Sequence, residues 1–337
     1  MSGLCMPRDL FVAYISEQIG FKSGLALSFD ELISHTDATT ELHSQLIDDG
    51  IDQVSIHFDD LLDSFQLILH RLGVLPHKIA YHAPTFFRHQ SKTDPARQQL
   101  IEEIFNLLSG KNDWALPKPG KEMSDFLSTA TDRWGQQGLS LAKEIVDMMY
   151  LYRVGSLCEL DRFRMVNWVN TVHLKELFSS ESLDTAYGEF IDQRFIDYLE
   201  ANSTSIDSMN WRKFEGLTGE FFSRSGYEIA MGTGRGDGGV DIRAWKPGSD
   251  QKSPPTILIQ CKRQRSAVEQ VIVKALWADV EDEGAESGLV VTSSRIAPGA
   301  KKISTARGYP IDFAERSSLE LWLKALRTPG SGIFMQN

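Results

Sequence analysis

The sequence predicts an α/β domain over residues 205–337, with a central mixed sheet flanked by helices, preceded by a mostly α-helical domain over residues 1–204. In the second part, short apolar runs alternate with amphipathic stretches in the order α-β-β-β-α-β-α-β-α, which is typical of such a sheet. In the first part, apolar residues recur mainly at helical spacing. The small polar run A-N-S-T-S at residues 201–205 predicts a hinge between the two parts.

Helical periodicity dominates the first part. Pro95 stands at the start of one amphipathic stretch, a position that suits proline. Another long stretch is interrupted near Gly135 and Gly138. We expect helices at residues 9–19, 61–72, 95–108, 123–152, 174–178 and 187–199, and we consider strands at residues 54–58 and 78–82.

The second part begins with a helix that ends before Gly226 and continues into a strand and a Gly-rich turn. The remaining strands are apolar and the remaining helices amphipathic. We expect helices at residues 211–225, 267–282, 298–307 and 319–326, and strands at residues 227–231, 240–245, 256–262, 288–294 and 311–313.

Composition indicates a soluble protein of the reducing cytoplasm. Three widely spaced cysteines predict neither a disulfide framework nor a zinc site, and no apolar run is long enough to span a membrane. The formal net charge is −11 over 337 residues, but it is unevenly distributed. Residues 205–337 carry 18 Lys+Arg against 16 Asp+Glu, and the preceding residues carry 17 against 30. The acidic part therefore predicts a protein partner or merely a solvated surface, whereas the second part can bind phosphates.

Side-chain alternation brings a possible metal site to one end of the sheet. In the strand at residues 256–262, Gln260 and Lys262 lie on the same face. A hairpin with the preceding strand brings Asp241 close to both. An acid, an amide oxygen and a lysine can hold a hard cation and place a positive charge beside an attacking water. No histidine follows His173, so a histidine general base is excluded from residues 205–337.

Three short motifs in a fixed order carry a resemblance to a known family. They are Phe214-Glu215 in a helix, the run G-R-G-D-G-G-V-D ending at Asp241, and Gln260-Cys261-Lys262 in a strand. The run fits G-x-G-x-x-G by letter, but a strand and not a helix follows it, which excludes a dinucleotide site. Over residues 210–327 the sequence resembles the Mrr-like restriction endonuclease domain of the PD-(D/E)XK nuclease superfamily.

The resemblance implies a role for each motif residue. Asp241 would be the main metal carboxylate, Gln260 would ligate through its carbonyl oxygen, and Lys262 would orient the water and stabilise the phosphate in the transition state. The implied cofactor is Mg²⁺, for which Mn²⁺ can substitute. The implied activity is hydrolysis of DNA phosphodiester bonds, as in type IV restriction of foreign or phage DNA.

A second carboxylate is expected from the helix at residues 211–225, because Gln260 brings no charge. Glu215 lies at the edge of the buried stripe of this helix, and Glu220 lies further round toward solvent. We therefore prefer Glu215 as the third metal ligand and keep Glu220 as the alternative.

Basic residues near the site are candidates for contacts with DNA. The Gly-rich turn allows a close approach of the DNA backbone, where Arg235 can touch a phosphate. Arg263 and Arg265 follow the Q-x-K strand and are further candidates. A third set lies at the C-terminal end of the strand at residues 288–294; its members, which serve equally well as ordinary turn residues, are Thr292, Ser293 and Arg295.

Two classes of function remain open. In the first, the protein is an endonuclease that acts as a homodimer or higher oligomer, since one site cuts one strand, with residues 1–204 serving recognition or regulation. Such an endonuclease can require an activating partner or signal, and its alternative substrate is RNA. In the second, the C-terminal domain binds nucleic acid without cutting it. The complete set Glu215, Asp241, Gln260 and Lys262 favours the enzyme.

Overall fold

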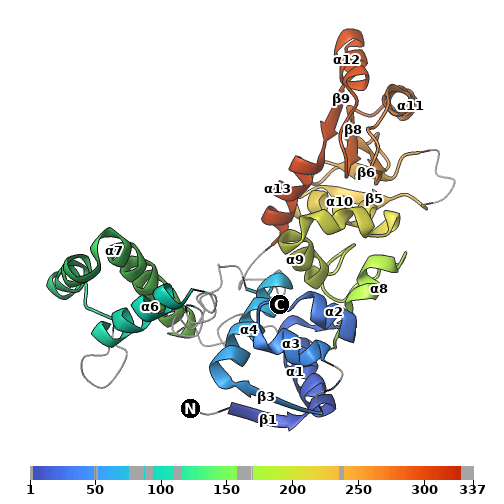
Figure 1. Ribbon diagram of the computed structural model, residues 1–337. Coiled ribbons are helices and arrows are strands. Elements are labelled where there is room, and N and C mark those ends of the chain that lie inside the picture. The colour runs from blue at the N-terminus through green and yellow to red at the C-terminus, as the bar shows by residue number, and fades with distance from the viewer. Residues whose placement is uncertain are drawn as a thin grey trace. The chain divides into compact units, whose positions relative to one another are not determined.

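The computed structural model describes residues 3–48, 50, 52–75, 87, 94–108, 116–157, 168, 170–234 and 239–327 (Figure 1). The chain forms two compact units. The first comprises Met1–Ile19, Phe29–His70 and Leu75–Met165, and the second comprises Gly20–Ser28, Arg71–Val74 and Val166–Asn337.

The first unit is mostly helical. Its helices are α1 (Arg8–Ser23, whose last turn belongs to the second unit), α2 (Phe29–Ser34), α3 (Glu41–Ile47), α4 (Phe58–Arg71), α6 (Pro95–Leu108) and α7 (Lys121–Leu157). Strand β1 (Gly3–Pro7) pairs antiparallel with β3 (Gln53–His57). Helices α6 and α7 share an apolar core that includes Ile104 and Ile145. Helix α7 breaks at Gly135, which has a φ of 63°, a value that glycine adopts without steric strain. The predicted interruption there is confirmed.

The second unit is built on a mixed sheet of five strands in the order β5-β6-β7-β8-β9. Strands β5 (Glu228–Met231), β6 (Ile242–Trp245) and β7 (Ile257–Lys262) form an antiparallel meander. Strands β8 (Ser287–Thr292) and β9 (Ile311–Ala314) then add in parallel. The predicted mixed sheet flanked by helices is confirmed for this part of the chain.

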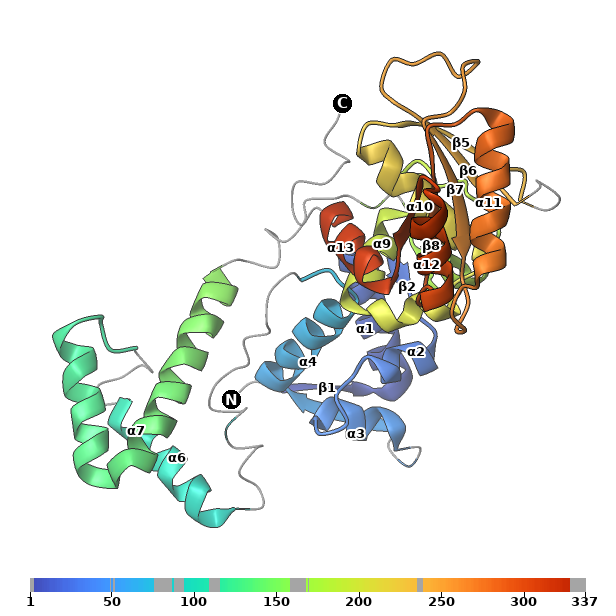
Figure 2. The same cartoon turned by 90° about the horizontal axis from the view of Figure 1, so that it is seen from above.

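Helices cover both faces of this sheet (Figure 2). Cys261 faces α10 (Trp211–Arg224), where its thiol lies 3.6 Å from the Thr218 hydroxyl. Leu258, three residues earlier in the same strand, packs into the core formed with α11 (Gln270–Glu283) and α12 (Pro298–Arg307). Helix α13 (Arg316–Leu326) follows β9. The alternation of side chains along β7 thus matches the two helical layers.

Residues that precede the sheet in the sequence are also part of the second unit. Strand β2 (Leu25–Ala26) pairs in parallel with β4 (Val172–His173), and helices α8 (Leu174–Ser179), α9 (Gln193–Ala201) and the 3₁₀ segment η1 (Ser203–Ser208) follow. Arg316 donates to the carbonyl oxygen of Ser203 at 3.0 Å, and Arg327 donates to that of Gly73 at 2.8 Å. The compact unit therefore begins well before the hinge expected at residues 201–205.

The predicted helices and strands of residues 205–327 all have counterparts in the structure, with ends that differ by a few residues. In the first part, the strand considered at residues 54–58 corresponds to β3, and the one at residues 78–82 lies outside the described residues. The helix expected at residues 187–199 begins only at Gln193, because Asp192 caps it by accepting a hydrogen bond from the backbone N–H of Arg194. Within the described residues, no helix is both long and apolar enough to cross a bilayer.

Candidate active site

Asp241 lies directly against the end of β7. Its backbone N–H donates to the carbonyl oxygen of Ile259 at 3.0 Å, and its Oδ2 accepts from the backbone N–H of Cys261 at 2.6 Å. These two bonds flank Gln260, the residue between Ile259 and Cys261. The short hydrogen bond to a buried N–H fixes the carboxylate beside the Q-x-K strand, as the hairpin argument predicts.

Gln260 carries a buried amide with an unused acceptor. Its side chain is 4% exposed, and Oε1 has no hydrogen-bond partner among the described residues. A Cβ added to Gly239 would come within 2.9 Å of Gln260 Nε2, so the amide lies against the turn that leads to Asp241. Gly239 has a φ of 104°, and a side chain there would meet both backbone strain and this clash.

Glu215 is buried on α10 and is held by Arg212. Arg212 Nη1 donates to Glu215 Oε2 at 2.6 Å, and Nη2 donates to the carbonyl oxygen of Gly232 at 2.8 Å. The backbone N–H of Gly232 in turn donates to the carbonyl oxygen of Asp241 at 2.7 Å. Arg212 therefore ties the helix that carries Glu215 to the strand pair that carries Asp241. The sequence reasoning missed Arg212, although a basic residue three positions before a helical glutamate is a recognisable ion-pair signal.

The charges of three predicted site residues act on the pKa of the Cys261 thiol. Its pKa is raised well above the ordinary thiol value, first by burial and then by the carboxylates of Asp241 and Glu215, while Lys262 acts in the opposite direction. The charges of Asp241, Glu215 and Lys262 therefore all act on one buried thiol in β7, the last strand of the meander. Lys262 is half-buried, and its ammonium has no hydrogen bond or ion pair with the part of the chain that is described.

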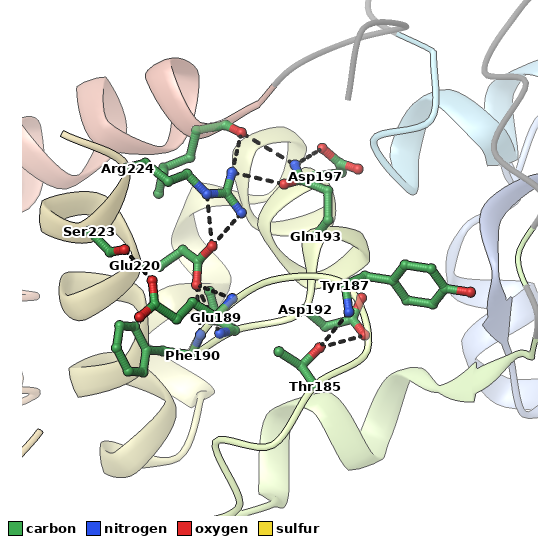
Figure 3. Close-up of polar contacts among 12 residues, drawn as sticks. Thr185, Tyr187, Glu189, Phe190, Asp192, Gln193, Asp197, Glu220, Ser223 and Arg224 are labelled. Atoms are coloured by element: carbon green, nitrogen blue, oxygen red, sulfur yellow. Dashed lines mark hydrogen bonds and ion pairs between the residues drawn. The ribbon is translucent and has the colours of Figure 1, made fainter. Parts of the chain in front are cut away.

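Glu220 has a different set of partners (Figure 3). Its Oε2 accepts from the backbone N–H groups of Glu189, Phe190 and Ile191 at 2.9, 2.7 and 3.4 Å. Its Oε1 accepts from Arg224 Nε at 2.7 Å. The expectation that Glu220 turns toward solvent is wrong: the side chain is buried and binds the connection between α8 and α9.

The candidate phosphate-binding residues divide into three groups. Arg235 lies outside the described residues. Arg263 is half-buried and donates to the carbonyl oxygen of Asp207 at 2.8 Å, so its guanidinium holds η1 in place. Arg265 and Arg295 are exposed.

The hydroxyls after β8 are engaged within the domain. Thr292 donates to the carbonyl oxygen of Lys262 at 2.7 Å. Ser293 donates to the carbonyl oxygen of Gln264 at 3.2 Å. Both side chains are buried and stabilise the turn after β7. They therefore act as ordinary turn residues, which is the alternative to phosphate binding given above.

The donor set suits a hard cation such as Mg²⁺. Among the described residues, no group of three or more His, Cys, Asp or Glu side chains gathers as a metal site. The candidate set consists instead of two carboxylates, Asp241 and Glu215, and the amide oxygen of Gln260. Gln260 has a buried acceptor oxygen without a partner among the described residues, and both of its neighbours in β7 bind Asp241. Such an oxygen is the kind of group that an oxygen-coordinated cation would satisfy. The residues present therefore fit the metal.

Comparison with known proteins places the C-terminal part in a family. Residues 206–323 match the family model of the Mrr catalytic domain, described as a restriction endonuclease. The chain also has a structural match, at a TM-score of 0.29 and 24% identity, to the MspJI restriction endonuclease in complex with a 27-mer oligonucleotide. That match covers 37% of this chain and 31% of the other, so this chain spans about a third of that structure. No curated protein matches. Residues 206–323, about a third of the chain, are thus similar to the Mrr catalytic domain of restriction endonucleases.

Proposed function

We propose that the protein is a Mg²⁺-dependent endonuclease that hydrolyses DNA phosphodiester bonds in defence against foreign DNA. The observation that carries the proposal is the buried, unpartnered Oε1 of Gln260 beside the hydrogen-bonded carboxylate of Asp241. Leaving such an acceptor unsatisfied costs about 1–3 kcal/mol, so the sequence retains a group that is costly unless something binds it. The Mrr-type domain at residues 206–323 supports nuclease chemistry as that use.

Asp241, Glu215 and Gln260 would hold the metal through oxygen atoms. A Mg²⁺ ion bound there would supply an activated water and neutralise charge on the scissile phosphate. Lys262, whose ammonium has no partner in the described part of the chain, would orient the attacking water and stabilise the charge that develops on the phosphate. Cys261 stays protonated at neutral pH because its pKa is raised, so it serves as packing and not as a nucleophile.

The unit as a whole would act on duplex DNA as a homodimer or higher oligomer, since one site cuts one strand. Arg265 is the exposed basic side chain that follows the Q-x-K strand and would contact a DNA phosphate. The acidic first part of the chain would meet a protein partner or an activating signal rather than DNA.

The test is cleavage of methylated and unmethylated plasmid by the full-length protein in Mg²⁺, in Mn²⁺ and in EDTA. We expect metal-dependent cutting that falls by about 100-fold or more in Asp241→Ala and in Lys262→Ala, because each removes a charge from the reacting centre. Lys246→Ala is the matched control, since Lys246 is an exposed basic residue that pairs with Glu286 and lies after β6, at the other end of that strand from Asp241.

A folded wild-type protein that binds DNA equally well in Mg²⁺ and in EDTA, is unaffected by Asp241→Ala and never cuts would contradict the proposal. That result would identify a binding module. Linear rather than nicked product would support the dimer.

A further inference from the structure

Arg212, which is partly exposed, forms an ion pair with the buried Glu215, one of the three proposed metal ligands. The guanidinium lies 2.6 Å from Glu215 Oε2, and the two side chains are 15% and 5% exposed. The same guanidinium donates to the carbonyl oxygen of Gly232, whose backbone N–H donates to the carbonyl oxygen of Asp241, so it links the helix of Glu215 to the strand pair of Asp241. Arg212 therefore places a positive charge against a buried carboxylate in the metal-free state.

A divalent cation at the same carboxylate conflicts with this arrangement. A guanidinium and a dication that share one largely buried carboxylate repel each other, because Coulomb energies grow as the local dielectric falls. Either the guanidinium or the metal ion must then move away from Glu215, or Arg212 must pair with an additional anion. Arg212 can move without leaving the site, because Nη2 is independently anchored on the Gly232 carbonyl oxygen at 2.8 Å.

The surroundings of Arg212 indicate which anion it would gain. The backbone of Gly234, at the start of the Gly-rich turn, passes close enough that an added Cβ would lie 3.7 Å from Arg212 Nη1. Trp211 approaches the same point at 3.0 Å. The guanidinium therefore stands at the turn that the sequence analysis expects to face the DNA backbone, and it remains partly exposed.

We propose that Arg212 is an exchangeable counter-ion: it neutralises Glu215 until metal binds and then pairs with a DNA phosphate. This inference rests on the proposed nuclease function. Arg212 would thereby couple metal binding to DNA binding. Its guanidinium pairs with the Glu215 carboxylate in the metal-free protein and with a DNA phosphate in the metal-bound protein.

The first measurement is Mg²⁺ and Mn²⁺ binding to DNA-free protein by isothermal titration calorimetry. Arg212→Ala should bind metal about 10-fold more tightly than wild type, because a competing positive charge is gone. Arg212→Lys keeps the charge and should stay near wild type. Arg224→Ala is the matched control, since Arg224 pairs with Glu220 on the same helix and should leave metal affinity unchanged.

The second measurement is DNA binding in a Lys262→Ala background, which blocks cleavage but keeps the three proposed ligands. At saturating Mg²⁺, Arg212→Ala should weaken DNA binding by about 10-fold, as expected for loss of a charged phosphate contact. In EDTA the two proteins should bind DNA alike, because Arg212 is then engaged with Glu215.

The outcomes separate this inference from the proposed function. Unchanged or weaker metal binding in Arg212→Ala, or an equal loss of DNA affinity with and without Mg²⁺, would overturn the exchange while leaving the nuclease site intact. Failure of the wild-type protein to bind metal would instead refute the proposed function itself.

Discussion

Two buried glutamines of the second unit show how differently the same side chain can be used. Gln193 is 1% exposed and fully engaged: its Nε2 donates to Asp197 and to the carbonyl oxygen of Leu326, and its Oε1 accepts from Arg224. Gln260 is similarly buried, yet its Oε1 has no partner among the described residues. The first stabilises the fold, and the second lowers its stability in the absence of a ligand.

Gln260→Met tests this difference, because methionine keeps the shape of the side chain and removes the orphaned oxygen. We expect the metal-free variant to gain about 1 kcal/mol in free energy of unfolding, since a buried unsatisfied acceptor is removed. We also expect it to lose the stabilisation that Mg²⁺ gives the wild type. Urea unfolding in EDTA and in Mg²⁺ measures both effects.

Gln193→Met is the matched control. It removes satisfied hydrogen bonds and should lower the free energy of unfolding in both buffers. If Gln260→Met behaves like this control, or still gains stability on addition of Mg²⁺, then Gln260 is not a ligand.

Residue-level prediction from the sequence was limited by what each side chain contacts in three dimensions. The spacing of Asp241, Gln260 and Lys262 follows from strand alternation alone, and the structure places Asp241 against the Q-x-K strand accordingly. The helical stripe could not show that residues 189–191 present three N–H groups to Glu220. Nor could it show that Asp207 holds Arg263. Both contacts join residues about 30 or more positions apart.

At the scale of elements, the connection between α8 and α9, residues 180–192, lies along helix α10. Lys213 donates to the carbonyl oxygen of Ser182. Burial lowers the pKa of Lys213, while Asp192 and Asp184 oppose the shift. Added Cβ atoms would meet the carbonyl oxygen of Phe190 at 2.9 Å from Gly216 and its ring at 3.2 Å from Gly219. The close approach of this connection explains two glycines in the middle of a helix, where each costs about 1 kcal/mol relative to alanine.

Glu220→Ala should separate this connection from the helix. It leaves the Arg224 Nε–H and three backbone N–H groups without their acceptor and removes a buried ion pair, and we expect a loss of about 3–5 kcal/mol in free energy of unfolding. Glu283→Ala is the matched control, because its ion pair with Arg243 is about a quarter exposed and should contribute about 1 kcal/mol or less. Chemical unfolding measures both variants. Equal losses would show that the buried contacts of Glu220 add nothing beyond an ordinary surface pair.

Long periodic elements were predicted well from the sequence, whereas several short ones in the first 204 residues were missed. Helix α12 has the predicted ends, because Pro298 and Gly308 mark them. Strands β2 and β4 have two residues each and helices α2 and α3 six and seven, too few for a periodic signal. Tyr187, Phe190 and Ile191 extend the apolar pattern ahead of α9, but they belong to the connection that contacts α10.

At the scale of the molecule, the family match and the compact unit have different beginnings. The match starts at residue 206, whereas the compact unit continues back to Val166 and includes Gly20–Ser28 and Arg71–Val74. Arg194 Nη1 donates to the carbonyl oxygens of Gly24 and Asn170 at 2.9 and 2.8 Å, and Asn202 donates to that of Arg71 at 2.6 Å. These contacts join residues far apart in the sequence, so the composition from which the hinge at residues 201–205 is predicted carries no information about them.

Truncation tests where the folding unit begins. A fragment of residues 205–337 lacks the connection that packs on Gly216 and Gly219, and we expect it to aggregate or unfold without cooperativity. A fragment of residues 166–337 keeps that connection and should unfold cooperatively, though at lower stability than the full chain. Circular dichroism during thermal unfolding distinguishes the two. Equal stability of both fragments would place the beginning of the folding unit at the predicted hinge.

The antiparallel meander β5-β6-β7 and helix α10 come from one uninterrupted run of sequence. Glu215, Asp241, Gln260 and Lys262 all lie within about 50 residues of one another, so bringing them together closes only short loops. Other contacts of the unit span far more chain, such as the bond between Arg327 and Gly73, which are 254 positions apart. In kinetic terms, the site belongs to the low-contact-order part of the fold. Its framework can form early in refolding, and the parallel strands β8 and β9 can join a site whose backbone is already in place.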